Sequence, residues 1–277
     1  MSENFRFRAT AVGASGFFSV PFNETIDARA SSALSGIGGY DSARADNYRL
    51  RELLSFGVVR SEVIGSHCPD EECGHTHTTV AKATVENLNV MDIVTADRIV
   101  ANLVSIYPDH ADGDTPREPS VRLLGSRFEN LRIAGIPVHP VLNVDTLDEY
   151  DTLTELQKAY PKVDRVRELF GNEALRARLS EAPSRISRWF HPAASSQLPF
   201  ADGLSSTSLV RELKPESSGL DIYGHVIHLK GFGAIRLGEV QITRSTRSVT
   251  MLQIDFDCPL KGRVGFCFLE DGGSPPW

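Results

Sequence analysis

The stretch SHCPDEECGHTHT, residues 66–78, holds two cysteines and three histidines, the densest group of potential metal ligands in the chain. Zinc prefers thiolate and imidazole ligands in tetrahedral sets. The candidate zinc ligands are Cys68, Cys73, His75 and His77. In the usual zinc site two residues separate a pair of cysteines, whereas four residues, PDEE, separate this pair. This acidic stretch is typical of a turn. A hairpin end with a disulfide or free thiols, or a simple solvated loop, is the alternative hypothesis.

Two histidines in the stretch GHVIHLKGFG form a second group, which indicates acid–base chemistry or ligand binding. Residues three apart on a regular strand point to opposite faces, so His225 and His228 would share a site only at a bulge, which the nearby glycines permit. We take His225, His228 and Glu239 as candidate catalytic residues. The alternative is that the histidines are hydrogen-bonded strand residues and that Arg236 and Glu239 form an exposed cross-strand charge pair.

The stretch RISRWFHP, residues 185–192, combines arginines with aromatic side chains at the end of a helical segment. Guanidinium groups bind anions through paired hydrogen bonds and stack on aromatic rings, so this composition favours an anionic or planar ligand. The candidate ligand-binding residues are Arg185, Arg188, Trp189, His191 and Arg236. The alternative is that the aromatic rings fix the helices to a sheet while the arginines stay in water.

The composition narrows the class of protein. The 277 residues are 41% hydrophobic and 23% charged, as in an ordinary globular protein, and the formal net charge is −7. A negative chain without a basic stripe argues against nucleic-acid binding. The sequence has no apolar run long enough to span a membrane, and its N-terminal residues do not resemble a signal peptide. We therefore expect a cytoplasmic protein, or an extracytoplasmic one if a leader was removed.

The location also decides the state of the cysteines, which form the local pairs Cys68/Cys73 and Cys258/Cys267. In the cytoplasm they would stay thiols or bind metal, and in an oxidising compartment each pair would close a hairpin. The stretch CPLKGRVGFC reads as a hairpin in any case, with Lys261 and Gly262 at its turn.

Apolar and polar residues alternate over short windows through the first 143 residues and again after residue 208, which indicates β-strands. The alternation changes phase once between residues 79 and 90. Residues 145–191 have a helical period instead, in which apolar residues recur every three or four positions: Leu147, Tyr150, Leu153, Leu156 and Tyr160. This segment is too short for a core of its own. We predict one β-rich domain over residues 1–277, sandwich-like or built of stacked β units, with a helical insertion or cap at about 145–191.

Two segments of the chain have similar sequences. They share a Glu-Asn pair and the order of their apolar residues: TVENLNVMDIVTA (84–96) and RFENLRIAGIPVH (127–139). A looser third copy lies at 225–240. Such periods are typical of repeated β units. The alternative is that amphipathic strand-turn-strand segments have converged on one pattern.

The stretch TTVAKATVENLNVMDIVTADRIVANL, preceded by ASSALSGIGGY, resembles the β-rich repeats of bacterial choice-of-anchor proteins. The resemblance covers roughly residues 9–143 and depends on Thr95, Ala96 and Asp97 with the pattern around them. Those proteins are extracytoplasmic chains of small-residue strands, and the family implies no reaction. The resemblance therefore implies a β-rich fold rather than an activity.

The sequence has no nucleotide, phosphate or catalytic-triad signature, and two functions follow. The first is non-enzymatic binding or self-assembly, in which strands present faces or edges to a partner or to further copies of the chain in a homo-oligomer. The second is a small-molecule enzyme, a lyase, isomerase or hydrolase, with a histidine-based site between the sheet and the helical cap. Zinc is the only cofactor that the residues indicate, and only for the second function.

Overall fold

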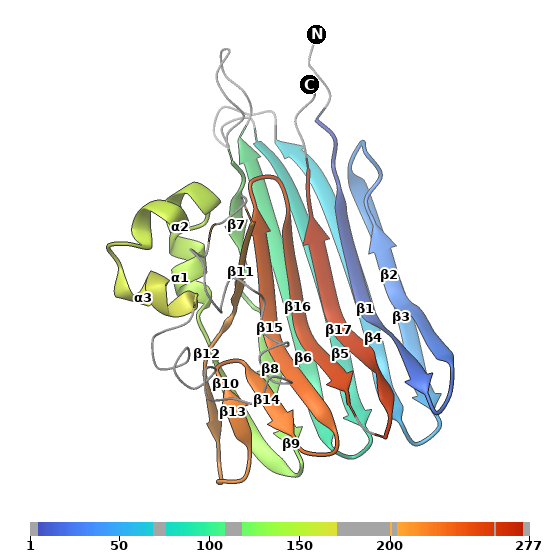
Figure 1. The fold of residues 1–277 in the computed structure, drawn as a ribbon. Coiled ribbons are helices and arrows are strands. Elements are labelled where there is room, and N and C mark those ends of the chain that lie inside the picture. The colour runs from blue at the N-terminus through green and yellow to red at the C-terminus, as the bar shows by residue number, and fades with distance from the viewer. Residues whose placement is uncertain are drawn as a thin grey trace.

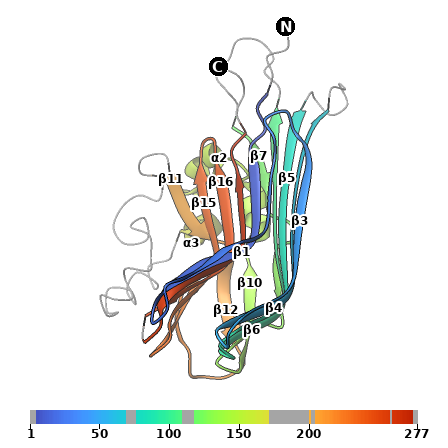
Figure 2. The same ribbon diagram turned by 90° about the vertical axis from the view of Figure 1, so that its right-hand side faces the viewer.

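The protein folds as a sandwich of two antiparallel β-sheets, which confirms the mainly β fold predicted from the alternating sequence. The computed structural model describes residues 5–68, 76–108, 118–170, 200, 204–257 and 259–273. Figure 1 shows the two sheets one behind the other, and Figure 2 shows them edge-on as two layers. Apolar side chains from both layers, and from three short helices at one edge, form one core.

The first sheet joins strands from both ends of the sequence. In spatial order its strands are β13 (Asp221–Tyr223), β14 (Val226–Leu229), β15 (Gly233–Thr243), β16 (Arg247–Phe256), β17 (Lys261–Asp271), β1 (Ala9–Val20) and β2 (Glu24–Ala33), and β11 (Leu204–Ser208) also pairs with β15. Because β1 pairs with β17 along most of its length, the N-terminal hairpin extends a sheet that the C-terminal strands build.

The second sheet comes from the middle of the sequence. In spatial order its strands are β12 (Val210–Pro215), β10 (Ile136–Leu142), β9 (Arg132–Ile133), β6 (Val94–Pro108), β5 (Thr76–Val90), β4 (Leu54–Cys68) and β3 (Gly39–Leu50), while β7 (Ser120–Arg122) and β8 (Arg127–Glu129) also pair with β6. Three of these strands have fifteen residues each, so the hairpins β4–β5 and β5–β6 run the whole length of the sandwich.

Three short helices lie beside one edge of the sandwich (Figure 1). They are α1 (Val144–Glu149), α2 (Leu153–Ala159) and α3 (Asp164–Leu169). The side chain of Thr152 caps α2 by accepting a hydrogen bond from Glu155 N at 3.1 Å. Leu147, Leu153 and Leu156 are buried and belong to the common core, so these helices cover the open edge between the sheets. They lie within the predicted helical segment, whose part from 171 to 191 is outside the described residues.

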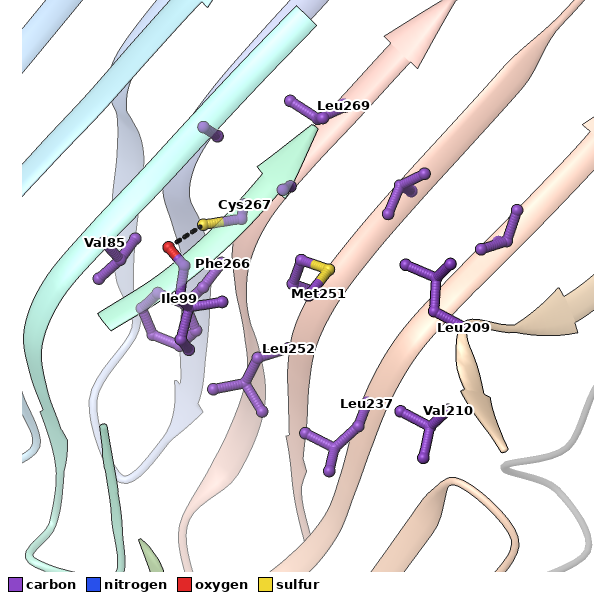
Figure 3. Packing of buried hydrophobic residues seen from close by; sticks show 14 of the residues in the cluster. Val85, Ile99, Leu209, Val210, Leu237, Met251, Leu252, Phe266, Cys267 and Leu269 are labelled. Carbon is purple, nitrogen blue, oxygen red and sulfur yellow. Dashed lines mark hydrogen bonds between the residues drawn. The ribbon is translucent and has the colours of Figure 1, made fainter. Parts of the chain in front are cut away.

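A line of interrupted alternation, which we call the crease, crosses the first sheet at mid-length. At this level two successive residues are buried on β16, Met251 and Leu252, and on β17, Phe266 and Cys267. On β15 the level is marked by Leu237 and Gly238, which end a longer buried run, and Gly238 has no partner in the register with β16. The pairs lie side by side in the register, and Figure 3 shows their labelled side chains in one core. Gly238 and Cys267 have positive φ angles of 62° and 53°, which turn the strands. Figure 2 shows the first sheet bending toward its outer side.

The C-terminal hairpin decides the state of one cysteine and corrects the predicted turn. Cys267 is a free, fully buried thiol whose Sγ donates to the carbonyl oxygen of Ile99 in the opposite sheet at 3.5 Å (Figure 3), so it does not pair with Cys258, which lies outside the described residues. The turn also lies elsewhere, because Lys261 begins β17 and Gly262 pairs with Phe256 of β16. The glycine in this stretch marks a close approach of strands rather than a hairpin turn.

The two segments with similar sequences share a local conformation. Both contain a hairpin turn whose two central residues have positive φ, Met91 and Asp92 in one and Ala134 and Gly135 in the other. Their shared Glu-Asn pairs flank β6 from opposite sides, since β5 and β8 both pair with that strand. Arg98 of β6 consequently forms ion pairs with both glutamates. An internal repeat stays a prediction, but the shared sequence has a common structural role around β6.

Candidate functional site

A hollow of about 600 Å³ lies on the outer face of the first sheet, over β1, β15, β16 and β17. We call it the outer hollow. Six charged or amide side chains line it: Arg236, Glu239, Gln241, Gln253, Arg263 and Glu270. They come from both sides of the crease, because the strand pairing places Arg236 and Gln253 in one row and Glu239 and Thr250 in the row beyond it. The bend that the crease produces therefore turns a flat sheet face into a concave one (Figure 2).

A chain of ion pairs holds the two arginines of the outer hollow. Asp255 accepts hydrogen bonds from Arg236 Nε at 3.1 Å and from Arg263 Nε at 2.5 Å. Arg236 Nη1 also donates to Glu239 Oε1 at 2.9 Å. The side chains of Asp255 and Arg236 are only 5% and 10% exposed, so each buried charge has an opposite charge within hydrogen-bond distance. This arrangement fixes the arginine side chains and cancels most of their field.

Two residues predicted from the sequence line this hollow, Arg236 and Glu239, and a third, His225, lies beside Glu239. His225 Nε2 lies 3.8 Å from Glu239 Oε1, which is longer than a hydrogen bond. His225 lies with Gly224, whose φ is 60°, in the turn between β13 and β14 and not at a bulge within a strand. His228 is buried on β14 opposite Ala234, in the row next to Arg236 on the same face of the sheet.

The centre of the outer hollow is open because Gly265 has no side chain. Gly265 lies between Gln253 and Ser15 in the same row, and a Cβ atom added to it would have no heavy atom within 4 Å. Sequence reasoning missed Gly265, Gln253 and Arg263, since polar residues and glycine on a strand look like an ordinary solvated face. The only available signal was their position on β16 and β17, the two strands that follow β15 in the sheet, and this position depends on the strand pairing.

Two aromatic rings complete the lining. Phe17 of β1 is 48% exposed, although most phenylalanines of the described chain are buried, and Phe268 of β17 is half-buried. Phe17 pairs with Arg263, so its ring lies at the same end of the hollow as the ion pairs. An exposed aromatic ring in a polar depression gives a ligand an apolar surface to pack on.

The stretch with the predicted metal ligands lies at the end of the β4–β5 hairpin. Cys68 ends β4 and His77 lies on β5, while Cys73 and His75 are outside the described residues. The ring of His77 stacks on Phe5 at 4.2 Å and on His67 at 4.4 Å between centroids. Within the described residues, no group of three or more His, Cys, Asp or Glu side chains is placed to hold a metal ion. The choice among zinc, disulfide and loop stays a prediction.

The region between the sheets and the described helices is not a substrate pocket. The cavity there is about 10 Å³, room for about one water molecule, and its lining is mainly apolar, including Leu103, Leu156 and Val249. This cavity is too small for a substrate, and the predicted site between sheet and helical cap stays a prediction. Four of the predicted ligand-binding residues lie outside the described residues: Arg185, Arg188, Trp189 and His191.

A buried polar group that the sequence did not indicate lies between the sheets. Tyr107 of β6 donates a hydrogen bond to Asp271 Oδ2 of β17 at 2.6 Å. Burial raises the pKa of Tyr107 and of Asp271, although the hydroxyl groups of Ser105, Tyr107 and Thr79 oppose the rise at Asp271. Burial also lowers the pKa of Arg247, which pairs with Asp271 in the register, to about 10. These contacts join the two layers and have no opening to the outer hollow, which lies on the other face of the sheet.

Comparison with known proteins gives a family but no activity. The family model described as a domain of unknown function, DUF8256, matches residues 5–243. The chain belongs to this family. The matched region includes Arg236 and Glu239 of the outer hollow and ends before β16 and β17. No curated protein and no solved structure has significant similarity to the chain. The resemblance to choice-of-anchor repeats stays a prediction.

Proposed function

We propose that this protein is a non-enzymatic binding protein that takes a polar ligand in the outer hollow. The observation that carries the proposal is the hollow itself, whose volume of about 600 Å³ is in the range of small-molecule sites. Two of its lining side chains, Arg236 and Arg263, are held by ion pairs with Asp255 before any ligand arrives. Preorganised polar groups lose little entropy on binding, which favours specific recognition.

Binding on the face of the sheet is better supported than self-assembly through its edges. Asp41 of β3 accepts a hydrogen bond from Ala33 N of β2 at 2.9 Å, so a carboxylate already occupies an edge N–H group. The edge strand β3 also carries the charged residues Arg44, Asp46 and Arg49, and charges on an edge strand oppose pairing with another molecule. A homo-oligomer would therefore need a different contact.

The alternative enzymatic function has one favourable observation, the position of His225 beside Glu239, which lines the outer hollow. A general base needs an oriented hydrogen-bond network, and the 3.8 Å between His225 Nε2 and Glu239 Oε1 does not provide one between these two groups. Glu239 instead accepts a hydrogen bond from Arg236, so this carboxylate already has a charged partner within the protein. The geometry thus supports binding more strongly than acid–base catalysis.

The proposal is tested by filling the hollow. In Gly265→Leu the new side chain would occupy the open centre without a clash at its Cβ atom, so the fold should be retained. Gly36→Leu is the matched control, because Gly36 lies in the β2–β3 connection and also has no heavy atom within 4 Å of an added Cβ.

A thermal-shift screen with monosaccharides, oligosaccharides, amino acids and nucleotides compares the three proteins. We expect at least one compound to raise the Tm of wild type and Gly36→Leu but not that of Gly265→Leu. If no compound has an effect that depends on Gly265, the proposal is wrong.

A further inference from the structure

We infer that the ligand of the outer hollow is a neutral polyhydroxylated compound, a mono- or oligosaccharide; this inference rests on the proposed function. Its first support is the charge balance of the lining. Arg236 pairs with Glu239 and with the buried Asp255, Arg263 also pairs with Asp255, and Glu270 pairs with Arg8. Each charged side chain of the lining thus has an opposite charge beside it, so the field of the hollow does not favour a strongly charged ligand.

The second support is the kind of hydrogen-bonding group in the lining. Gln253 presents a donor and an acceptor in one plane, and Ser248 and Thr250 of the same strand present hydroxyl groups beside it. A sugar hydroxyl also both donates and accepts, so neighbouring hydroxyls can pair with one amide group. The half-exposed side chain of Arg263 adds further N–H donors at the opposite side.

The third support is the exposed ring of Phe17. A pyranose has an apolar C–H face, and packing of that face on an aromatic ring removes from water a surface that polar groups cannot satisfy. Phe17 and Phe268 provide two rings in a lining that is otherwise polar. A lipid would need a wider apolar surface, a nucleotide would bring net negative charge, and an amino acid would bring two full charges that need charged partners of their own. A saccharide therefore matches this combination best.

Affinity electrophoresis tests the inference. Wild type, Gly265→Leu, Gln253→Ala, Phe17→Ala and the control Gly36→Leu are run through native gels that contain a neutral polysaccharide, either dextran, soluble starch, xylan or galactomannan. We expect at least one of these polymers to retard wild type and Gly36→Leu, no retardation of Gly265→Leu, and a dissociation constant about 5- to 10-fold higher for Gln253→Ala, as the loss of one or two hydrogen bonds implies. Phe17→Ala should weaken binding by a similar factor.

Gels with the polyanions polygalacturonate and heparin separate this inference from the proposed function. If neutral polysaccharides and the free sugars of the thermal-shift screen have no Gly265-dependent effect while a charged compound has one, the saccharide inference is wrong and the binding function stands. If no compound in either assay depends on Gly265, the binding function is wrong as well. Circular dichroism of each variant confirms that a loss of binding does not come from a loss of the fold.

Discussion

The substitution Asp255→Asn tests whether the ion pairs beside the outer hollow are a rigid support. Asp255 lies between Arg236 and Arg263 and its side chain is 5% exposed. Asparagine has the same shape and keeps one oxygen as a hydrogen-bond acceptor, but it removes the negative charge. Arg236, which is 10% exposed, then retains Glu239 as its charged partner at 2.9 Å.

The magnitude follows from the distance and the burial. At 2.9 Å the attraction between Arg236 Nη2 and Asp255 is about 6 kcal/mol at an effective dielectric constant of about 20. The cost of burying both charges offsets part of this, and breaking a buried pair typically costs about 3–5 kcal/mol. Because the asparagine side chain would keep a hydrogen bond and Arg236 would keep Glu239, we expect the lower value, a loss of about 3 kcal/mol in the free energy of unfolding.

Urea unfolding followed by circular dichroism of the β signal measures the loss. Arg263→Gln is the internal comparison: its side chain is 52% exposed, and Asp255 keeps Arg236, so the loss should stay below about 1 kcal/mol. Glu212→Gln, in an exposed pair with Lys214 on β12, controls for charge removal alone and should change stability by less than about 0.5 kcal/mol. Equal losses for Asp255→Asn and Arg263→Gln would refute the claim that the buried charge of Arg236 depends on Asp255.

Three further predictions concern the core. Gly13→Ala would place a Cβ atom 1.8 Å from Val59 Cγ1 and should cost about 1–3 kcal/mol in urea unfolding, and Val59→Ala in the same chain should recover part of this loss; additive losses would contradict it. Burial raises the pKa of the Cys267 thiol, so a thiol reagent should label Cys267 only as fast as the protein unfolds, and rapid labelling of the native protein would count against its buried position. Burial also raises the pKa of Asp271 above its unfolded value of 3.8, so the folded protein binds that proton more tightly and loses this stability as the pH rises through the folded pKa. The stability of Asp271→Asn relative to wild type should therefore increase from about pH 4 to about pH 7, and a constant difference would contradict the shift.

The fold was predictable because side-chain alternation directly reflects burial in a two-layer sandwich. The buried residues Ala81, Ala83 and Val85 follow period two along β5, and the phase change seen in the sequence appears after them, where Leu88 is the next buried residue. The helical period likewise marked Leu153 and Leu156 as core residues beside the sheets. Local patterns thus identified the elements, but the order of strands depends on pairing between residues more than a hundred positions apart, such as Ala9 with Asp271.

The candidate site was predictable only in part. His225, Arg236 and Glu239 were chosen from the sequence for their chemistry and lie together at the outer hollow, although catalysis by them stays a prediction. The importance of Gly265 depends on the absence of a neighbour above it, and that of Asp255 on two arginines from other strands. Neither property has a local signal, because both arise from the register of β15, β16 and β17.

The crease connects the core with the outer hollow through one physical cause. On a regular strand every second side chain faces outward. On β17 the successive residues Phe266 and Cys267 are both buried, so one side chain that would otherwise face outward is missing from the outer face at this level. The same happens beside it on β16, which adds apolar surface to the core and creates a concavity on the outer face. Outward residues on both sides of this level, Gln253 and Thr250 on β16 among them, then face a common space. Cys267 has a left-handed backbone conformation, which costs energy for a residue other than glycine. The packing of the core must offset this cost, so we infer that the packing enforces the bend.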